Sequence, residues 1–224
     1  MSFSDMNGIL AALDALPPGE ALFDLDGTLI HHDIGEATLR RQIARGPLPA
    51  AATAWLGTED PWAVYEKLDP VSQCVAAAVA LAGLDRAAVE TLVDEAFAAG
   101  DVTPNAAICE LAAAIGRRHR VWILTGSAEV LGEAVAPRLG IRHVRGVRLI
   151  ERNGILGDRV DGIVSCAEGK VRATWVHFGR RPVFAIGDSP WDLHLLRLAH
   201  VARTTGRIAG MEFPGYPAEP PPAA

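Results

Sequence analysis

The chain has 224 residues, of which 50% are hydrophobic and 21% are charged, and its formal net charge at pH 7 is -6. This length fits one domain, or a core with a modest insert, and the acidic balance argues against a nucleic-acid-binding protein, which would carry a basic face. Neither a signal peptide nor a stretch of about 18 apolar residues is visible, so we expect no membrane span. The 3 cysteines lack metal-type spacing and are expected to be reduced thiols in a soluble, cytoplasmic protein.

The first half of the chain is predicted to hold one strand followed by a helical insert. Residues 5–16 have helical spacing of apolar side chains, and Pro17, Pro18 and Gly19 end that helix. The apolar run at residues 21–23 is typical of a strand that is buried on both faces. Residues 33–100 are alanine-rich without any strand-like run, and their Gly and Pro breaks indicate about four short helices.

The second half of the chain alternates between strands and helices. Asn153-Gly154 is a strong hairpin turn signal. The expected elements are helices at 104–115, 128–139, 168–178 and 191–198, strands at 120–124 and 182–186, and a hairpin made by 147–150 and 155–160. This alternation predicts an α/β fold with a Rossmann-like parallel sheet and helices on both faces, to which a small all-α insert and a β-hairpin are added.

The chain is therefore predicted to divide into three parts. Residues 1–32 and 101–212 form the α/β core, and residues 33–100 form the helical insert. Residues 213–224 are a proline-rich tail that we expect to be disordered.

Carboxylates follow two of the predicted buried strands. Asp24 and Asp26 come directly after Phe23, and Asp188 follows the strand at 182–186. Open α/β sheets bind ligands outside the carboxyl ends of their strands, so we expect these groups to meet at one edge. An Asp-Gly surface turn explains Asp26 but not Asp24. Three converging carboxylates would repel one another unless a hard cation lay between them, and Mg²⁺ suits oxygen ligands.

Two further segments lie where they could complete such a site. The second strand runs into Thr125, Gly126 and Ser127 before a helix begins, and free N–H groups with the helix dipole favour an anion there. Ser127 could instead cap that helix while Thr125 binds the ligand. Lys170 taken alone is an ordinary surface lysine, and Asp192 is suited to cap the last helix.

In chain order, these segments form a recognisable series. The series is Asp24-Leu25-Asp26-Gly27-Thr28-Leu29, then Thr125-Gly126-Ser127, then Gly169-Lys170, then Gly187-Asp188-Ser189 with Asp192. It resembles the motif series of the haloacid dehalogenase-like (HAD) superfamily, whose members are mostly phosphatases. The resemblance extends over about 21–198, in the expected strand and helix contexts.

The resemblance implies a mechanism and a metal. Asp24 would be the nucleophile that forms an aspartyl-phosphate, and Asp26 would protonate the leaving oxygen and later deprotonate water. Mg²⁺ would be held by the Asp24 carboxylate, the backbone carbonyl of Asp26, and Asp188. Family dehalogenases lack an acid at the position of Asp26, so the resemblance disfavours dehalogenation.

The resemblance also implies how the phosphoryl group is bound. Thr125, the neighbouring backbone N–H groups at Gly126 and Ser127, and Lys170 would contact the phosphoryl oxygens. Asp192 would orient Lys170 or a metal-bound water.

The helical insert implies a substrate class. In this superfamily such an insert is a cap that selects the substrate, and a helical cap with a later hairpin is similar to the phosphoserine-phosphatase branch. Asp33 aligns best with the acidic residue that binds the substrate ammonium there, with Glu36 as the second choice. Asp33 is shorter than the usual glutamate, Gly27 replaces a frequent serine, and no arginine of the insert aligns with the one that binds the serine carboxylate.

A second interpretation of the insert rests on its aromatic residues. Trp55, Trp62 and Tyr65 lie close together with Glu59 and Asp60, and aromatic faces with carboxylates bind ammonium groups well. This pattern suits phosphocholine or phosphoethanolamine, although the favoured interpretation is that the three aromatics form the small hydrophobic core of the insert.

Together these features predict a Mg²⁺-dependent phosphomonoesterase that acts on a small, amino-bearing, phosphoserine-like metabolite. The alternatives are a phosphocholine or phosphoethanolamine phosphatase, a phosphotransferase or mutase with the same nucleophile, and a non-catalytic module. The expected partner is a small phosphorylated metabolite, without nucleic acid or membrane, and the expected state is a monomer or homodimer.

Overall fold

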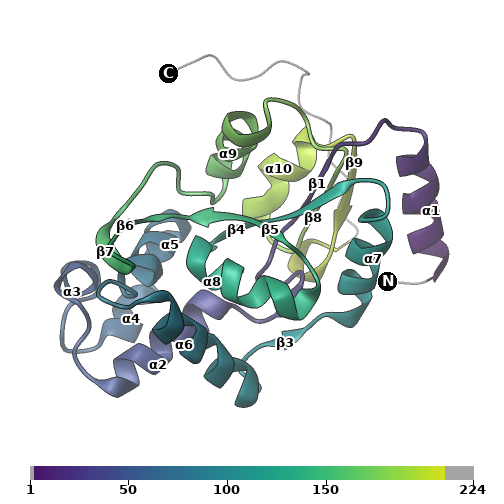
Figure 1. Ribbon diagram of the computed structural model, residues 1–224. Helices are drawn as coiled ribbons and strands as arrows, with labels where there is room; N and C mark the ends of the chain where they lie inside the picture. Colours follow the sequence, from purple (N-terminus) through teal and green to yellow (C-terminus); the bar gives the residue numbers. More distant parts are fainter. Residues whose placement is uncertain (1–2, 210–224) are drawn as a thin grey trace.

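The computed structural model describes residues 3–209, which are built around one parallel sheet (Figure 1). The order of the strands is β5–β4–β1–β8–β9. Their bounds are β1 (Glu20–Phe23), β4 (Arg120–Ala128), β5 (His143–Val147), β8 (Phe184–Gly187) and β9 (Val201–Thr204). In the centre, Leu22 of β1 pairs with Trp122 of β4 and with Ala185 of β8, and all neighbours run parallel. β1 therefore delivers the residues that follow it to the middle of the sheet edge.

Helices cover both faces of this sheet because successive strand residues point to opposite sides. Leu22 and Leu124 pack with Leu195 on the side of α9 and α10, whereas Phe23 and Ile123 belong to the larger core on the other side. The helices are α1 (Phe3–Asp14), α7 (Ala106–Ile115), α8 (Glu129–Val135), α9 (Glu168–Phe178) and α10 (Leu193–Leu198). A fully buried leucine such as Leu22 contributes roughly 1.5–3 kcal/mol. The predicted α/β fold is confirmed.

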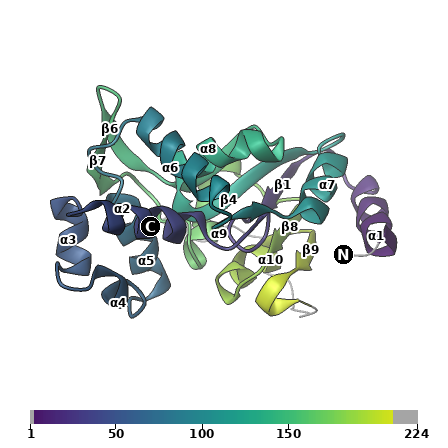
Figure 2. The same cartoon turned by 90° about the horizontal axis from the view of Figure 1, so that it is seen from below.

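The helical insert lies beside the sheet (Figure 2) and contains five helices rather than about four. They are α2 (Ile34–Arg45), α3 (Ala50–Leu56), α4 (Pro61–Tyr65), α5 (Pro70–Val79) and α6 (Arg86–Ala98). Pro61 and Pro70 are the first residues of helices, a position where proline is favoured because no N–H is needed. An aspartate caps each of these starts; the Asp60 carboxylate, for example, accepts from Ala63 N at 3.0 Å.

Two antiparallel strand pairs join the insert to the sheet. β2 (Ile30–His31) pairs with β3 (Thr103–Pro104), so the chain leaves and re-enters the core at one place. The hairpin of β6 (Leu149–Arg152) and β7 (Ile155–Val160) turns at Asn153 and Gly154, whose φ angles are 51° and 80°. Leu156 N donates to Leu84 O at 2.9 Å, which ties the hairpin to the insert. The division into core and insert domains stays a prediction.

Several boundaries differ from the predicted ones. β5 and β9 were not predicted, because Arg145, Gly146 and Arg203 interrupt their apolar residues, and edge strands are less buried than central ones. β4 continues through Ala128, and the helix predicted at 128–139 is α8 followed by a 3₁₀ turn, Ala136–Leu139. Likewise, the helix predicted at 191–198 is a 3₁₀ turn, Pro190–Asp192, followed by α10.

Two further predictions concern the chain as a whole. The proline-rich tail predicted at 213–224 lies outside the described residues. Within residues 3–209, none of the helices combines the length and the apolar character that crossing a bilayer requires.

Candidate active site

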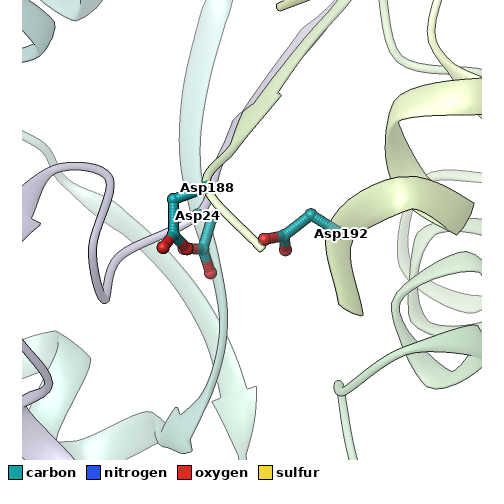
Figure 3. A group of neighbouring side chains, drawn as sticks. All are labelled: Asp24, Asp188 and Asp192. Atoms are coloured by element: carbon teal, nitrogen blue, oxygen red, sulfur yellow. The ribbon is translucent and has the colours of Figure 1, made fainter. Parts of the chain in front are cut away.

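The carboxyl ends of β1 and β8 bring the predicted acidic residues together. Asp24 N donates to Ile186 O at 3.0 Å, so the chain after β1 is still held against β8. In Figure 3, the Asp192 carboxylate points toward those of Asp24 and Asp188, which lie beside each other. One ligand atom from each of these three buried residues lies within 4.8 Å of the others. The edge of the sheet thus carries a compact group of oxygen donors.

Both oxygens of Asp24 are held by hydrogen bonds. Thr28 Oγ1 donates to Asp24 Oδ2 at 3.0 Å, and Lys170 Nζ donates to Asp24 Oδ1 at 2.6 Å. Burial raises the pKa of Asp24 and the charge of Asp192 raises it further, against the opposing effect of Lys170. The carboxylate is therefore oriented, and it repels its acidic neighbours in a way that a bound cation would relieve.

Lys170 is a buried cation at the centre of the site. Its side chain rises from the first turn of α9, is 3% exposed, and reaches both Asp24 and Asp192. Burial alone would lower the pKa of Lys170, but the charges of Asp192 and Asp24 outweigh it and raise the pKa. Lys170 is therefore charged and is not the ordinary surface lysine that its isolated sequence would suggest.

Asp192 takes part in a capping box and positions Lys170. Its Oδ2 accepts from Ser189 N at 3.1 Å and from Ser189 Oγ at 2.8 Å, and its Oδ1 accepts from Lys170. Gly187 makes room for it, because a Cβ on that glycine would lie 2.5 Å from Asp192 Cβ. The predicted contact with Lys170 is therefore present, whereas the predicted cap is not: Ser189 is the N-cap of the turn, Asp192 is the third residue of its capping box, and the Asp192 side chain makes no capping bond to α10.

The Asp26 carboxylate accepts hydrogen bonds from three donors, none of which is a partner of Asp24 or Asp192. Its Oδ1 accepts from Ile34 N at 2.8 Å, and its Oδ2 accepts from Thr125 Oγ1 at 3.0 Å and Ser127 Oγ at 2.8 Å. Burial, with the charge of Asp33, raises the pKa of Asp26 to about 8 in spite of these bonds. A carboxyl group that keeps its proton near neutral pH is suited to general acid catalysis.

The predicted phosphate-binding segment is arranged differently from what we expected. Thr125, Gly126 and Ser127 belong to β4, and Ala128, which makes no side-chain capping bond, precedes α8. Ser127 does not cap that helix: its hydroxyl, like that of Thr125, donates to Asp26. Gly126 and Ser127 line the cavity that is described below, where a substrate could reach them. Their part in substrate binding stays a prediction.

A cavity of about 180 Å³ lies over these residues, between the helical insert and the core. Asp33, Glu36 and Tyr65 line it from the insert side. The Asp33 carboxylate accepts from Glu36 N at 2.8 Å and so caps α2, and burial raises the pKa of Asp33 to about 7. Burial also raises the pKa of Glu36. A larger hollow of about 620 Å³ at the amino ends of the strands is lined by no carboxylate of the described residues.

The aromatic residues of the insert do not surround this cavity. Of Trp55, Trp62 and Tyr65, only Tyr65 is among its lining residues, and Trp55 is 43% exposed. The Trp62 ring lies 5.1 Å from that of Tyr65, and its face is covered by the guanidinium of Arg40 at 3.4 Å. This packing supports the interpretation as the small core of the insert for Trp62 and Tyr65 but not for the exposed Trp55, and it gives the aromatic cage little support.

The donor set fits a hard divalent cation. Asp24, Asp188 and Asp192 offer only oxygen atoms, which is the ligand type that Mg²⁺ prefers. Burial and the charge of Asp192 raise the pKa of Asp188, so its negative charge is not fully compensated by Arg207. Asp192 lies close to the predicted ligands Asp24 and Asp188. The third predicted ligand is the backbone carbonyl of Asp26, and it stays a prediction.

Sequence reasoning missed Arg207. Its Nε lies 3.6 Å from Asp188 Oδ2, and it lines the cavity from the 3₁₀ turn Gly206–Ile208 that follows β9. Because β9 itself carries no clear strand signal, nothing in the sequence pointed to a residue returning to this edge. Arg207 adds a cation at the mouth of a cavity whose opposite wall is acidic.

Comparison with known proteins agrees with this architecture. A HAD family hydrolase from Salmonella enterica subsp. enterica serovar Typhi is similar at 19% identity and a TM-score of 0.57, over 83% of this chain and 62% of that one. A structure described as a phospho-aspartyl intermediate analogue of phosphoserine phosphatase is similar at 18% identity and a TM-score of 0.56, over 84% of this chain and 87% of that one. A probable phosphoserine phosphatase from Vibrio cholerae is similar at 16% identity and a TM-score of 0.56, over 90% of this chain and 63% of that one.

These likenesses show the fold, and the chain spans less than two thirds of the Salmonella and Vibrio chains. No curated protein matches it. The family model described as haloacid dehalogenase-like hydrolase matches residues 21–197, from β1 to α10. That match extends over most of the chain and takes in Asp24, Lys170 and Asp188, so the chain belongs to the haloacid dehalogenase-like hydrolase family.

Proposed function

We propose that the chain is a Mg²⁺-dependent phosphomonoester phosphatase that works through an aspartyl-phosphate on Asp24. The observation that carries this proposal is that two carboxyl groups with different partners lie at one sheet edge, Asp24 beside the Lys170 cation and Asp26 among neutral donors. Asp24 is fixed by Thr28 and Lys170, and its neighbour Asp26 has a pKa raised to about 8 by burial. Such a pair supplies a nucleophile and a general acid from the same strand end.

The residues divide the reaction into two steps. In the first, an Asp24 oxygen attacks phosphorus, the ester P–O bond breaks, and Asp26 gives its proton to the leaving oxygen. In the second, Asp26 accepts a proton from water as the water oxygen attacks phosphorus, and the bond to Asp24 breaks. Lys170 would stabilise charge on the phosphoryl oxygens throughout. Asp24, Asp188 and the backbone carbonyl of Asp26 would hold Mg²⁺, with Asp192 beside them as the partner of Lys170, and the ion would shield the nucleophile from phosphate repulsion and stabilise the transferring group.

The cavity favours a zwitterionic substrate such as phosphoserine. Asp33 and Glu36 on the insert side would accept an ammonium group, and Arg207 on the core side would bind a carboxylate. Arg207 thereby takes the place of the arginine that the insert sequence does not offer. Phosphocholine and phosphoethanolamine lack the carboxylate and would leave Arg207 without a partner in the substrate.

The test is phosphate release from phosphoserine, phosphoethanolamine, phosphocholine and sugar phosphates in the presence of Mg²⁺. We expect phosphoserine to be preferred, and Arg207→Gln to lower kcat/KM for phosphoserine about 10- to 100-fold, the usual loss for a charged hydrogen bond. The matched control is Arg203→Gln, which removes an exposed arginine of β9 that does not line the cavity.

Three outcomes would contradict parts of this proposal. If Arg207→Gln changed all substrates equally, the carboxylate contact would be wrong. If sugar phosphates were preferred, the ammonium site at Asp33 and Glu36 would be wrong. If an added alcohol or sugar phosphate became phosphorylated in place of phosphate release, the chain would be a phosphotransferase or mutase.

A further inference from the structure

Two cysteines from different parts of the fold meet in the wall of the cavity. Cys74 belongs to α5 of the helical insert, and Cys166 belongs to the core segment just before α9. Both line the cavity with Asp24 and Lys170. A Cβ on Gly126 would lie 2.9 Å from Cys74 Sγ and 3.7 Å from Cys166 Cβ, so both pack against the same glycine. The two thiols are close enough for each to shift the pKa of the other.

The two thiols differ in their chemistry. The interaction between the two thiols raises the pKa of Cys74 and lowers that of Cys166. Burial and the charge of Asp192 oppose the lowering at Cys166, but the positive charge of Lys170 adds to it and the pKa of Cys166 stays below its usual value. Cys166 therefore carries more thiolate character, and Cys74 is the neighbouring thiol that can resolve an oxidised Cys166. Cys109 lies apart from them on α7, where its thiol donates to Leu29 O at 3.7 Å.

We propose that Cys74 and Cys166 form a peroxide-sensitive site at which oxidation joins the helical insert to the core by a disulfide. The Cys166 thiolate attacks hydrogen peroxide, an S–O bond forms, the O–O bond breaks, and the departing hydroxide takes a proton to become water. The Cys74 sulfur, on losing its proton, attacks the resulting sulfenic sulfur, and a second water leaves. Two thiols lose two electrons in total, and one peroxide is reduced to two waters.

The disulfide has a consequence for access to the site. Asp24 is 5% exposed and Lys170 is 3% exposed, and both line a cavity of only about 180 Å³ between the insert and the core, so we expect the insert to move away from the core when a phosphate ester enters. A covalent bond between α5 and the segment before α9 would restrict that movement. This consequence rests on the proposed phosphatase function, whereas the formation of the disulfide does not.

The first experiment measures the bond itself. The full chain is treated with hydrogen peroxide, its free thiols are counted, and a non-reduced digest is analysed by mass spectrometry. We expect the free thiols to fall from 3 to 1 and a peptide linking Cys74 to Cys166 to appear. Cys109→Ser should still form the link, whereas Cys74→Ser and Cys166→Ser should not. Three remaining thiols, or a link that includes Cys109, would overturn the proposal.

The second experiment measures the consequence, with each variant compared with its own untreated sample. Hydrolysis of phosphoserine by the wild-type chain and by Cys109→Ser should fall at least tenfold after peroxide, a change of about 1.4 kcal/mol in the barrier. Dithiothreitol should restore it. In Cys74→Ser, peroxide should not cause a fall in hydrolysis that dithiothreitol restores. A disulfide that forms without any change in hydrolysis would overturn the restriction on access. A chain that hydrolyses none of the phosphate esters would refute the phosphatase proposal, and the count of free thiols would still decide whether the disulfide forms.

Discussion

Gly27 lies between Asp26 and Thr28, whose hydroxyl holds Asp24. Two features of the structure, its backbone conformation and its closeness to Asp188, require that this residue have no side chain. Its φ angle is +75°, which side-chain-bearing residues rarely adopt, and a Cβ there would lie 2.5 Å from Asp188 Oδ2. We therefore predict that Gly27→Ala displaces Asp188 and lowers kcat/KM roughly 100-fold, the usual effect of misplacing a site by about 1 Å. Steady-state hydrolysis of phosphoserine measures this.

Gly83→Ala is the matched control for this substitution. Gly83 has a φ angle of +87°, but no atom would lie within 4 Å of its Cβ. Both variants have backbone strain of order 1 kcal/mol. Only in Gly27→Ala does the added methyl group collide with a residue of the site, Asp188. Equal activity losses in the two variants would show that strain rather than Asp188 is responsible.

The protonation of Asp26 predicts a pH dependence of catalysis. Because burial raises the pKa of Asp26 to about 8, this group keeps its proton through neutral pH and loses it above that value. We predict that kcat/KM for phosphoserine, whose alkoxide leaving group needs a proton, falls as the pH rises through about 8.

The control for this profile is p-nitrophenyl phosphate, whose leaving group departs without a proton. Its rate should fall much less over the same range. Parallel pH profiles for the two substrates would contradict the role of Asp26 as the acid.

Among the elements, α6 shows how the insert is held together. The Asp85 side chain accepts from Ala88 N at 2.8 Å and caps this helix, which buries Val89, Leu92, Val93 and Ala96. Asp85→Ala is predicted to destabilise the fold by about 1 kcal/mol and lower the Tm by about 2–4 °C. Thermal unfolding measures this, and Asp85→Ser, which can still cap, should behave almost like the wild type. Identical Tm values for Asp85→Ala and the wild type would show that this cap is dispensable.

The elements that could be predicted from the sequence are those with strong local signals. The central strands β1, β4 and β8 are apolar and end in polar residues, and Asn153-Gly154 supplies the left-handed turn of its hairpin. The edge strand β9 carries Arg203 and few apolar residues, so its pairing with β8 depends on tertiary packing. Because β9 was not predicted, Arg207 was not predicted to line the cavity either: it lies in the turn that directly follows this strand.

The candidate site was predictable to the same extent. The convergence of Asp24 and Asp188 follows from the rule that parallel strands end at one edge, whereas Asp192, which was expected as a cap or a partner of Lys170, joins them in place of the Asp26 carboxylate. That Thr125 and Ser127 donate to Asp26 was not predicted, because it depends on β4 continuing past Leu124 and on the distance between two strand ends. Contacts between residues about a hundred positions apart require the register of the sheet, which the sequence alone does not provide.

At the scale of the whole molecule, the acidic edge of the sheet links stability to metal binding. Three carboxylates with ligand atoms within 4.8 Å are compensated in part by Lys170 and Arg207. We predict that millimolar Mg²⁺ raises the Tm, because a ligand bound only by the folded state stabilises it by RT ln(1 + [L]/Kd). A chelator should reverse this.

Asp188→Asn tests whether that stabilisation comes from this site. It removes one charge of the group while keeping the shape of the side chain, and it should abolish most of the increase in Tm with Mg²⁺. Asp161→Asn, which changes an exposed carboxylate paired with Arg148 on the surface, is the control. An unchanged response in Asp188→Asn would place the metal elsewhere.

The central claim is that Asp24 is the nucleophile, and the most direct measurement is phosphate release from phosphoserine by the wild-type chain and by Asp24→Asn. The amide has almost the shape of the carboxylate and can still accept from Thr28, but it cannot form an aspartyl-phosphate. We predict at least a 10⁴-fold loss of kcat, of about 5.5 kcal/mol or more, with a folded protein. Asp24→Asn that retained wild-type turnover would contradict the account.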